Sequence, residues 1–463
     1  MANGKTNVML VKRKRLIFFM MCLLIGLMTP NMVNSVPTNE EQSLQLTWSK
    51  TLDNPTGYGL IPLQFLYTTG DPLVNESYFI TGLYIVNGIE IPCFLKTDLN
   101  GDLVWNQSFI HPSKPQGLLR SLVQTSDGGF ALSGWIKSSL GNDYNTYDLW
   151  IIKTDGDGVE VWNRTFNGQK DSFDYGSQIL ETPDGGFLIS GCTGAAENWE
   201  IDYWLIKLNG NGTEIWNKTY HRIGADQATA LVPLSGGNFL ISGLSSQYST
   251  SENPHSIWVI KIDENGTVIW DKVFSKGTET LGAWERNLVG TNDGGFILSY
   301  YQRASLHVGK DYLVVKVDQE GEVEWEKTIG GDDYDTPSAC LQNEAGDYYI
   351  GGSYDSSEGE YETGDFCLTK LSSSGEILWQ QKHGDRIAGE TIVDMRFING
   401  VNSNDTIGVC GQVNFAGDYS SAKCWLGRYE YVKDIDKQSS SSGIIVLSLG
   451  LGIITLFCKK RLY

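Results

Sequence analysis

The chain of 463 residues has eight cysteines but neither a CxxC motif nor a vicinal cysteine pair. A zinc site built from cysteine pairs therefore has no support. The chain is also short of positive charge, with 35 Lys and Arg against 55 Asp and Glu and a formal net charge of −20. Nucleic-acid binding needs clusters of Lys and Arg that neutralise phosphates, so the composition argues against a nucleic-acid partner.

Long apolar runs are missing except at the two ends. The first run, Leu16–Met28, follows the basic residues Lys12–Arg15. A basic stretch before a short apolar segment indicates a secretory signal peptide, here residues 1–35 with cleavage near Ser35. An uncleaved N-terminal anchor is the alternative. Residues 36–44 would then form a short leader.

The second apolar run, Gly443–Cys458, is followed at once by Lys459–Arg461. An apolar segment with a basic stop predicts a transmembrane anchor over residues 443–458 and a cytoplasmic tail over residues 459–463. The Ser-rich residues 433–442 predict a flexible linker. We therefore expect a single-pass protein of the cell membrane with its body, residues 45–432, outside the cell.

One segment recurs throughout that body. It reads DLWIIKTDGDGVEVW at Asp148–Trp162, DYWLIKLNGNGTEIW at Asp202–Trp216 and SIWVIKIDENGTVIW at Ser256–Trp270. Each copy reads as a β-hairpin whose turn ends in Gly. The closing tryptophans are 54 to 57 residues apart, which indicates a repeat architecture; they are Trp48, Trp105, Trp162, Trp216, Trp270, Trp325 and Trp379.

A second motif keeps the same period and supplies two further strands. DGGF turns, as at Asp127–Phe130 and Asp184–Phe187, begin one strand in three repeats, and looser copies such as Ser235–Gly243 do so in others. The strand before each turn is expected over Ser121–Thr125, Gln178–Thr182 and Ala230–Leu234. Four short antiparallel strands per period are typical of propeller blades. A solenoid is the alternative, but its repeats are usually shorter.

The two ends of the body complement each other. Gln45–Leu52 carries a Trp strand without a preceding Lys strand, and Lys423–Glu430 is a Lys-type strand without a following Trp strand. Each end supplies what the other lacks. The sequence therefore predicts an all-β, seven-bladed propeller of four-stranded antiparallel blades, closed by the N-terminal strand so that no sheet edge is left open.

The pattern K-x-D-x-x-G-x-x-x-W with GGF turns resembles the tryptophan-docking blades of PQQ-like propellers. It resembles more closely secreted prokaryotic proteins built only from such blades, over about Gln45–Tyr431. The resemblance implies the fold, but propellers host enzymes and binders alike. Quinone enzymes of this kind hold calcium beneath the quinone and often carry vicinal cysteines, which this chain lacks. A quinone- or calcium-dependent extracellular enzyme is the alternative function.

Residues that recur in every blade are interpreted as scaffold. The strand before each Gly turn carries a basic residue whose charge we expect to reach a turn carboxylate; these are Lys96, Lys153, Lys207, Lys261, Lys316, Lys370 and Arg428. Turns such as Asp155–Gly158 are similar to calcium loops. Because other copies lose the acids without interrupting the repeat, turn geometry explains them better, and calcium is the alternative.

The residues that depart from the repeat are the candidate binding site. Three tryptophans lie outside the repeated positions, in loops or loop edges that a propeller places on one face, and arginines join them; the set is Trp135, Trp199, Trp284, Arg222, Arg286 and Arg386. We expect a non-enzymatic binding or scaffold module for surface proteins or glycans, without catalytic residues. The alternative is that long loops simply collect irregular residues. The five histidines fall in different blades, so no histidine-based metal site is expected.

Two covalent modifications are also predicted. Seven N-x-S/T sequons are candidate glycosylation sites; they are Asn75, Asn106, Asn163, Asn211, Asn217, Asn265 and Asn404. Cys410 and Cys424 flank one predicted loop and form a candidate disulfide in an oxidising compartment. The alternative is two small buried apolar side chains.

Overall fold

The structure, a computed structural model, is described over most of the predicted propeller. The described residues are 43–52, 60–68, 76–111, 114, 116–138, 146–168, 172–195, 200–222, 224–246, 255–274, 280–282, 287–303, 309–330, 334–356, 364–383, 388–398, 406–415 and 423–432. None of them belongs to a helix long and apolar enough to cross a membrane. The predicted signal peptide and C-terminal anchor lie outside this part of the chain.

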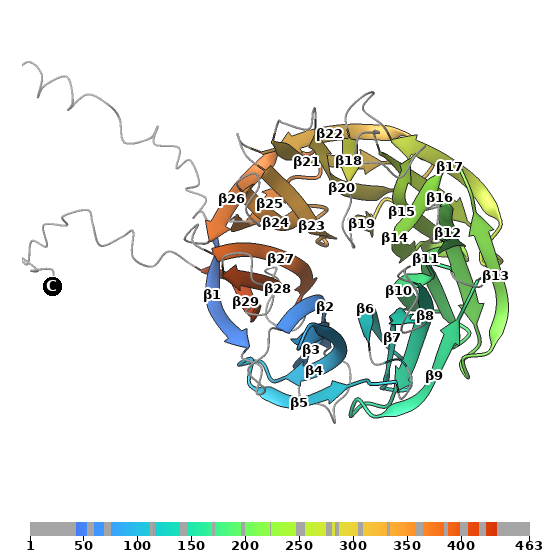
Figure 1. The fold of residues 1–463 in the computed structure, drawn as a ribbon. Coiled ribbons are helices and arrows are strands. Elements are labelled where there is room, and N and C mark those ends of the chain that lie inside the picture. The colour runs from blue at the N-terminus through green and yellow to red at the C-terminus, as the bar shows by residue number, and fades with distance from the viewer. Residues whose placement is uncertain are drawn as a thin grey trace, which may run out of the picture. The chain divides into compact units, whose positions relative to one another are not determined.

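The described strands form seven antiparallel sheets, which are the blades of a propeller (Figure 1). We name the strands of each blade a to d from the inside outward. Blade 1 contains β2 (Leu60–Thr68), β3 (Ser77–Val86), β4 (Ile89–Thr97) and β5 (Leu103–Ser108). Blade 2 contains β6 (Gly117–Gln124), β7 (Phe130–Lys137), β8 (Tyr147–Thr154) and β9 (Glu160–Phe166). Blade 3 contains β10 (Tyr175–Glu181), β11 (Phe187–Ala195), β12 (Glu200–Leu208) and β13 (Glu214–Tyr220).

The remaining blades follow the same order. Blade 4 contains β14 (Ala225–Pro233), the 3₁₀ turn η1 (Ser235–Gly237), β15 (Phe239–Ser246), β16 (Ser256–Ile262) and β17 (Val268–Phe274). Blade 5 contains β18 (Thr280–Gly282), β19 (Leu288–Gly290), β20 (Phe296–Arg303), β21 (Lys310–Val317) and β22 (Val323–Ile329), with β18 and β19 both paired to β20. Blade 6 contains β23 (Tyr334–Gln342), β24 (Tyr348–Ser356), β25 (Asp365–Leu371) and β26 (Ile377–His383). Blade 7 contains β27 (Ala388–Phe397), β28 (Ile407–Phe415), β29 (Lys423–Val432) and β1 (Ser43–Leu52).

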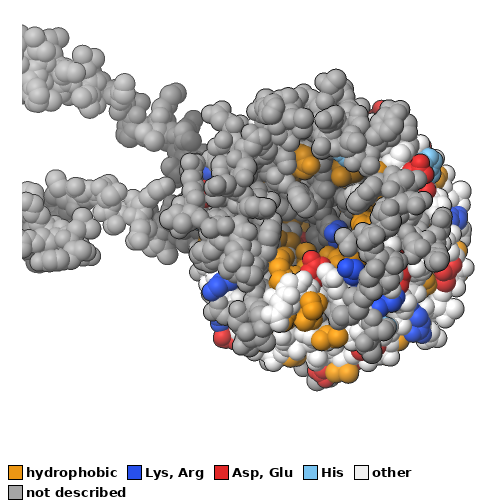
Figure 2. Space-filling view, viewed as in Figure 1, with side chains coloured by type: hydrophobic (Ala, Val, Ile, Leu, Met, Phe, Trp, Pro, Cys, Tyr) orange, Lys and Arg blue, Asp and Glu red, His pale blue; other side chains and the backbone are white. Residues whose placement is uncertain are grey.

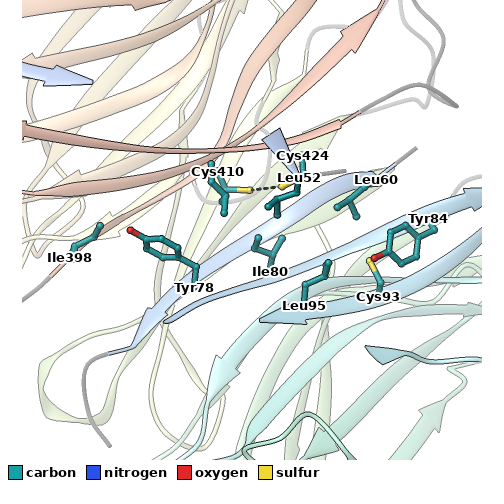
Figure 3. Close-up of a cluster of buried hydrophobic side chains, with 11 residues drawn as sticks. Leu52, Leu60, Tyr78, Ile80, Tyr84, Cys93, Leu95, Ile398, Cys410 and Cys424 are labelled. Carbon is teal, nitrogen blue, oxygen red and sulfur yellow. Dashed lines mark hydrogen bonds between the residues drawn. The ribbon is translucent and has the colours of Figure 1, made fainter. Parts of the chain in front are cut away.

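Blade 7 confirms the predicted closure, because its strand order is β1-β29-β28-β27. The first strand of the propeller is thus strand d of the last blade. A buried apolar cluster joins the two ends of the ring, since it includes Leu52 of β1, Leu60, Tyr78 and Ile80 of blade 1, and Leu426 of β29 (Figure 3). Lys50 of β1 also forms an ion pair with Asp102 of blade 1.

The inner strands begin earlier than the sequence predicted. β6, β10 and β14 start at Gly117, Tyr175 and Ala225, several residues before the expected positions. A β-bulge explains the difference, because one extra residue shifts the register between Leu119 and Ser121, and the same shift recurs in β10 and β14. A bulge breaks the alternation of inward and outward side chains, so the first part of the strand does not show a period of two.

The repeated tryptophans connect neighbouring blades. Trp105 of blade 1 covers the c–d turn of blade 2, where a Cβ added at Gly158 would lie 2.7 Å from the Trp105 ring. Gly158 also has a φ of +77°, a conformation that only glycine adopts readily. The same contact recurs with Trp162 against Gly212 and with Trp325 against Gly375. The Gly and Trp of the repeat are therefore two halves of one inter-blade contact.

Four of the repeated basic residues reach turn carboxylates, as expected, whereas Arg428 pairs with Glu430 of its own strand at 3.0 Å. Lys153, Lys207, Lys316 and Lys370 lie 2.8–3.0 Å from an Asp of the a–b turn of their own blade, and their side chains are at most 11% exposed. Blade 4 departs from this pattern because its a–b turn, Leu234–Asn238, has Gly236 in place of the DGG aspartate and carries no other aspartate. Lys261 instead donates a hydrogen bond to the Gln319 backbone carbonyl of the next blade, at 3.0 Å.

The turn aspartates of the c–d hairpins are engaged by the backbone. Asp155 Oδ1 accepts hydrogen bonds from the backbone N–H groups of Asp157 and Val159, at 3.0 and 2.9 Å. Asp263 and Asp318 cap their own turns in the same way. These contacts support the interpretation of the Asp–Gly turns as hairpin geometry.

Removal of β1 is predicted to destabilise the whole ring. A chain beginning at residue 53 loses strand d of blade 7 and Leu52 from the core, which exposes the edge of β29. We expect the melting temperature to fall by more than about 10 °C relative to a chain beginning at residue 43. Calorimetry on the two truncations measures this difference. Equal melting temperatures would show that closure by β1 does not support the fold.

The buried lysine contacts predict acid sensitivity. Hydrogen bonds from Lys207 and Thr182 lower the pKa of Asp184 to about 2. Burial opposes ionisation of Asp293, but hydrogen bonds from Thr291, Lys316 and the Gly295 backbone outweigh it and lower its pKa to about 2. A carboxyl whose pKa is lower in the folded than in the unfolded chain stabilises the fold above pH 4, and this stabilisation is lost as the pH falls from 4 to 2.

We therefore predict that Asp184→Asn with Asp293→Asn flattens the decline in stability between pH 4 and pH 2. The slope of the unfolding free energy against pH should fall by roughly 1.5 protons near pH 3, since two groups no longer titrate. Urea unfolding at several pH values measures the slope. The control is Asp157→Asn, which removes an exposed turn carboxylate and shows the effect of losing one negative charge alone. An unchanged slope in the double variant contradicts the prediction.

Candidate functional site

The b–c and d–a connections meet on one face of the described propeller. Between blades 2 and 3, the Tyr147 N–H donates to the Ser172 carbonyl at 3.2 Å, and the Phe173 N–H donates to the Gly194 carbonyl at 2.8 Å. The d–a connection of blade 2 thus bonds to the b–c ends of both blades, and we call this side the loop face. Figure 2 shows a hollow at the centre of the ring, with hydrophobic, basic and acidic side chains beside it.

Trp135 is the first residue of an aromatic row on the loop face. Its ring centroid lies 4.4 Å from that of Tyr147, which lies 5.1 Å from Phe173. Phe173 in turn lies 5.5 Å from Tyr175 with the rings nearly perpendicular. Trp135, Tyr147 and Phe173 are half-buried and Tyr175 is buried. We define these four residues as the aromatic row; three of its rings present surface to solvent.

A cation extends the row toward the inner strands. Arg120 is the bulge residue of β6, and its guanidinium lies 5.3 Å from the Tyr175 ring centroid, within the range of a cation–π contact. Burial raises the pKa of the Tyr147 hydroxyl, with the Glu90 carboxylate adding to the effect. The row therefore offers apolar ring faces, a neutral hydroxyl and a neighbouring cation.

Arg222 belongs to a second group, at the junction of blades 3 and 4. Its backbone N–H donates to Asp226 Oδ2 at 2.7 Å, and its Nη1 donates to Ser245 Oγ at 3.1 Å. The preceding residue, His221, has Nδ1 2.7 Å from Asp202 Oδ1 and 3.9 Å from Asp226 Oδ2. We define Asp202, His221 and Asp226 as the Asp-His-Asp cluster. Its three ligand-type atoms lie within 4.8 Å of one another, so these residues have the arrangement to hold a metal ion.

The three residues of the Asp-His-Asp cluster differ in their access to water. The Asp226 side chain is fully buried, whereas those of Asp202 and His221 are 32% and 62% exposed. The hydrogen bond to Asp202 raises the pKa of His221, and the charges of Asp226 and Glu200 add to this effect. A buried carboxylate and two accessible donors make a site that is anchored on one side and open to solvent on the other.

The structure describes two of the six predicted site residues. Trp135 and Arg222 lie on the loop face, at two successive blade junctions. Trp199, Trp284, Arg286 and Arg386 lie outside the described residues. The sequence reasoning missed Tyr147, Phe173 and Arg120, although the segment Ser172–Tyr175 carries two aromatic residues that the other d–a connections do not repeat. This local departure from the repeat is the sequence feature that could have identified Phe173 as a site residue.

A cavity of 360 Å³ lies away from the loop face, between the a–b turns of blades 3 and 4. Its lining includes Glu181, Leu234 and Asn238. Glu181 accepts hydrogen bonds from the Ser126 backbone N–H and hydroxyl, both at 2.8 Å. The altered turn of blade 4, where Gly236 replaces the DGG aspartate, contributes to its wall.

The structure describes both cysteines of the candidate disulfide and five of the seven candidate glycosylation sites. Cys410 and Cys424 are fully buried free thiols on adjacent strands with their sulfur atoms 3.7 Å apart (Figure 3). A disulfide requires about 2.05 Å, and this pairing stays a prediction. Asn106, Asn211, Asn217 and Asn265 are exposed and Asn163 is half-buried, whereas Asn75 and Asn404 lie outside the described residues.

Comparison with known proteins gives distant structural similarity alone. No family model and no curated protein matches the chain. A protein of unknown function from Dyadobacter fermentans is 11% identical, with a TM-score of 0.49 over 84% of this chain and 99% of its own. The Dos1 propeller is 11% identical, with a TM-score of 0.46 over 84% of this chain and 82% of its own. An α-L-arabinanase from Penicillium chrysogenum, complexed with arabinobiose, is 10% identical, with a TM-score of 0.41 over 82% and 99%. At this similarity the comparisons carry no functional argument.

Proposed function

We propose that the chain is a cell-surface propeller that binds glycans or proteins through its loop face and performs no catalysis. The observation that carries the proposal is the aromatic row. Three half-buried rings, Trp135, Tyr147 and Phe173, stand in contact at one blade junction. Aromatic side chains supply large rigid contact surfaces and are enriched at recognition sites.

The surroundings of the row favour glycans within this proposal. Sugar rings present C–H faces that pack on aromatic rings, and hydroxyl groups that hydrogen-bond to charged side chains. The neighbouring junction supplies such groups in Asp202 and His221, both accessible to solvent. Binding sites of this kind combine an apolar platform with a few placed polar groups. The repeated Lys, Asp and Trp residues are already engaged in the scaffold and leave the irregular residues for recognition.

A binding screen tests the aromatic row. The purified chain is applied to a glycan array and to a panel of surface proteins, and affinities for the retained ligand are measured with Trp135→Ala and Tyr147→Ala. We expect each change to weaken binding about tenfold or more, since each removes a ring that forms part of the platform. Trp135→Phe should retain part of the affinity.

The matched control is Val161→Ser, which changes an exposed apolar residue on strand d of blade 2, away from the loop face. It should bind as the unaltered chain does. Circular dichroism shows that each variant is folded. A ligand whose affinity is untouched by both aromatic changes would show that the site lies elsewhere, and quinone-dependent oxidation of sugars or alcohols would show that the class of protein is wrong.

Protease treatment of intact cells tests the proposed display of the propeller on the cell surface. If residues 443–458 anchor the chain and the propeller lies outside, protease added to intact cells should release the propeller by cutting within residues 433–442. Compact β-sheet resists cleavage, whereas Ser-rich linkers are preferred sites. Immunoblotting of the medium and the cells follows the fragment. Complete protection in intact cells, with cleavage only after lysis, would contradict surface display.

A further inference from the structure

We propose that Asp202, His221 and Asp226 bind one divalent transition-metal ion at the junction of blades 3 and 4, with Zn²⁺ as the test ion. This inference goes beyond the proposed function, which names Asp202 and His221 only as polar groups near the aromatic row, and its test measures metal uptake without any glycan or protein ligand. It also differs from the sequence-based expectation, which found no support for a zinc site of paired cysteines, kept calcium at the Asp–Gly turns as an alternative, and expected no histidine-based site because the histidines fall in different blades. Here one histidine, His221, combines with two carboxylates from neighbouring strands, Asp202 and Asp226, to give three metal ligands.

The donor atoms lie near the spacing of a tetrahedral ion, all within 4.8 Å of one another, and small side-chain movements would bring them to it. Bonds of about 2.0–2.2 Å to nitrogen and oxygen place the ligand atoms of a tetrahedral site about 3.3 Å apart. His221 Nδ1 lies 2.7 Å from Asp202 Oδ1 and 3.9 Å from Asp226 Oδ2, so the two separations bracket this value. One imidazole and two carboxylates are ligands that Zn²⁺ and Mn²⁺ accept. Binding requires Nδ1 without a proton, so an imidazolium would release one proton to solvent and a neutral imidazole would carry its single proton on Nε2.

Two of the three proposed ligands lie in strands, and the third directly follows one. Asp202 lies in β12, His221 directly follows β13 and Asp226 lies in β14. The Arg222 backbone N–H fixes Asp226 Oδ2 at 2.7 Å, and the guanidinium of Arg222 donates to Ser245. The exposed imidazole leaves the solvent side open for ion entry and for water as the fourth ligand.

The neighbouring blade junction provides an internal comparison. Strand pairing sets Phe166 opposite Leu149 in blade 2 and Tyr220 opposite Tyr203 in blade 3, so the next residue, Asn167, is the counterpart of His221. Asn167 Nδ2 donates to Asp148 Oδ1 at 2.8 Å, in the place where His221 meets Asp202.

The second carboxylate is also conserved between the two junctions. Asp174 Oδ2 accepts the Gly168 backbone N–H at 2.8 Å, just as Asp226 accepts that of Arg222. Both junctions therefore share the two carboxylates and the turn between them. The change from an amide, which only hydrogen-bonds there, to an imidazole is what converts this scaffold into a set of metal ligands.

The comparison also supplies the best variant. His221→Asn installs the residue that the fold already accepts at the neighbouring junction and keeps a hydrogen-bond donor for Asp202, but removes the metal-binding nitrogen. Asp202→Asn removes one carboxylate ligand. Asp157→Asn is its control, because it removes one negative charge from an exposed turn remote from the cluster.

Isothermal titration of the purified full-length chain with ZnCl₂ tests the site. We expect one Zn²⁺ per chain, with affinity lowered at least tenfold by His221→Asn and by Asp202→Asn and unchanged by Asp157→Asn. Zn²⁺ at 100 times its dissociation constant should raise the melting temperature of the unaltered chain by about 3 °C, and should raise that of His221→Asn by less. Ca²⁺, which prefers oxygen ligands, should compete poorly.

Two results would overturn the proposal. One is an unaltered chain that takes up no Zn²⁺. The other is Zn²⁺ uptake that both ligand variants leave unchanged, which would place the ion at a different site. Melting temperatures measured without metal show whether each variant is folded, so loss of binding is separable from loss of structure.

Discussion

The pairing of β1 with β29 is the constraint on which the rest of the structure depends. Each blade packs against two neighbours. An open ring would expose the packing surfaces of its first and last blades, and closure buries them. Closure places Leu52 beside Leu60 and Tyr78 in one buried cluster, so the two ends of the propeller stabilise each other. The Trp–Gly contacts repeat the same principle between successive blades, because Trp105 or Trp162 fills the space above the next blade's glycine turn.

Much of this fold is predictable from sequence because it is repeated. The period of the tryptophans indicates seven blades, and the incomplete end repeats indicate the closing strand. The contact of Lys153 with Asp127 is also foreseeable, since both residues recur together. Blade 4 shows the dependence plainly: where Gly236 replaces the aspartate, Lys261 bonds elsewhere. The bulges were missed because a residue such as Arg120 interrupts the alternation that identifies a strand.

The candidate site is less predictable, because it arises from residues that meet only in space. Trp135 and Arg222 stood out as departures from the repeat, but nothing in the sequence places Tyr147 against Phe173 across a blade junction. His221 illustrates the same limit. Its position after a strand is visible in the sequence, whereas its approach to Asp202 and Asp226 depends on three strands from two blades. In the proposed function, recognition falls to the positions where one copy of the repeat differs from its neighbours.

The proposed function places ligand binding on the loop face, at the aromatic row. Hydrogen–deuterium exchange of the chain, with and without the ligand that a glycan array retains, tests it most directly. If the ligand binds at the row, exchange should slow at residues 147–150 and 172–175, whose backbone amides lie beside Tyr147 and Phe173. Protection confined to the a–b turns, at residues 125–129, 182–186 and 234–238, would contradict it.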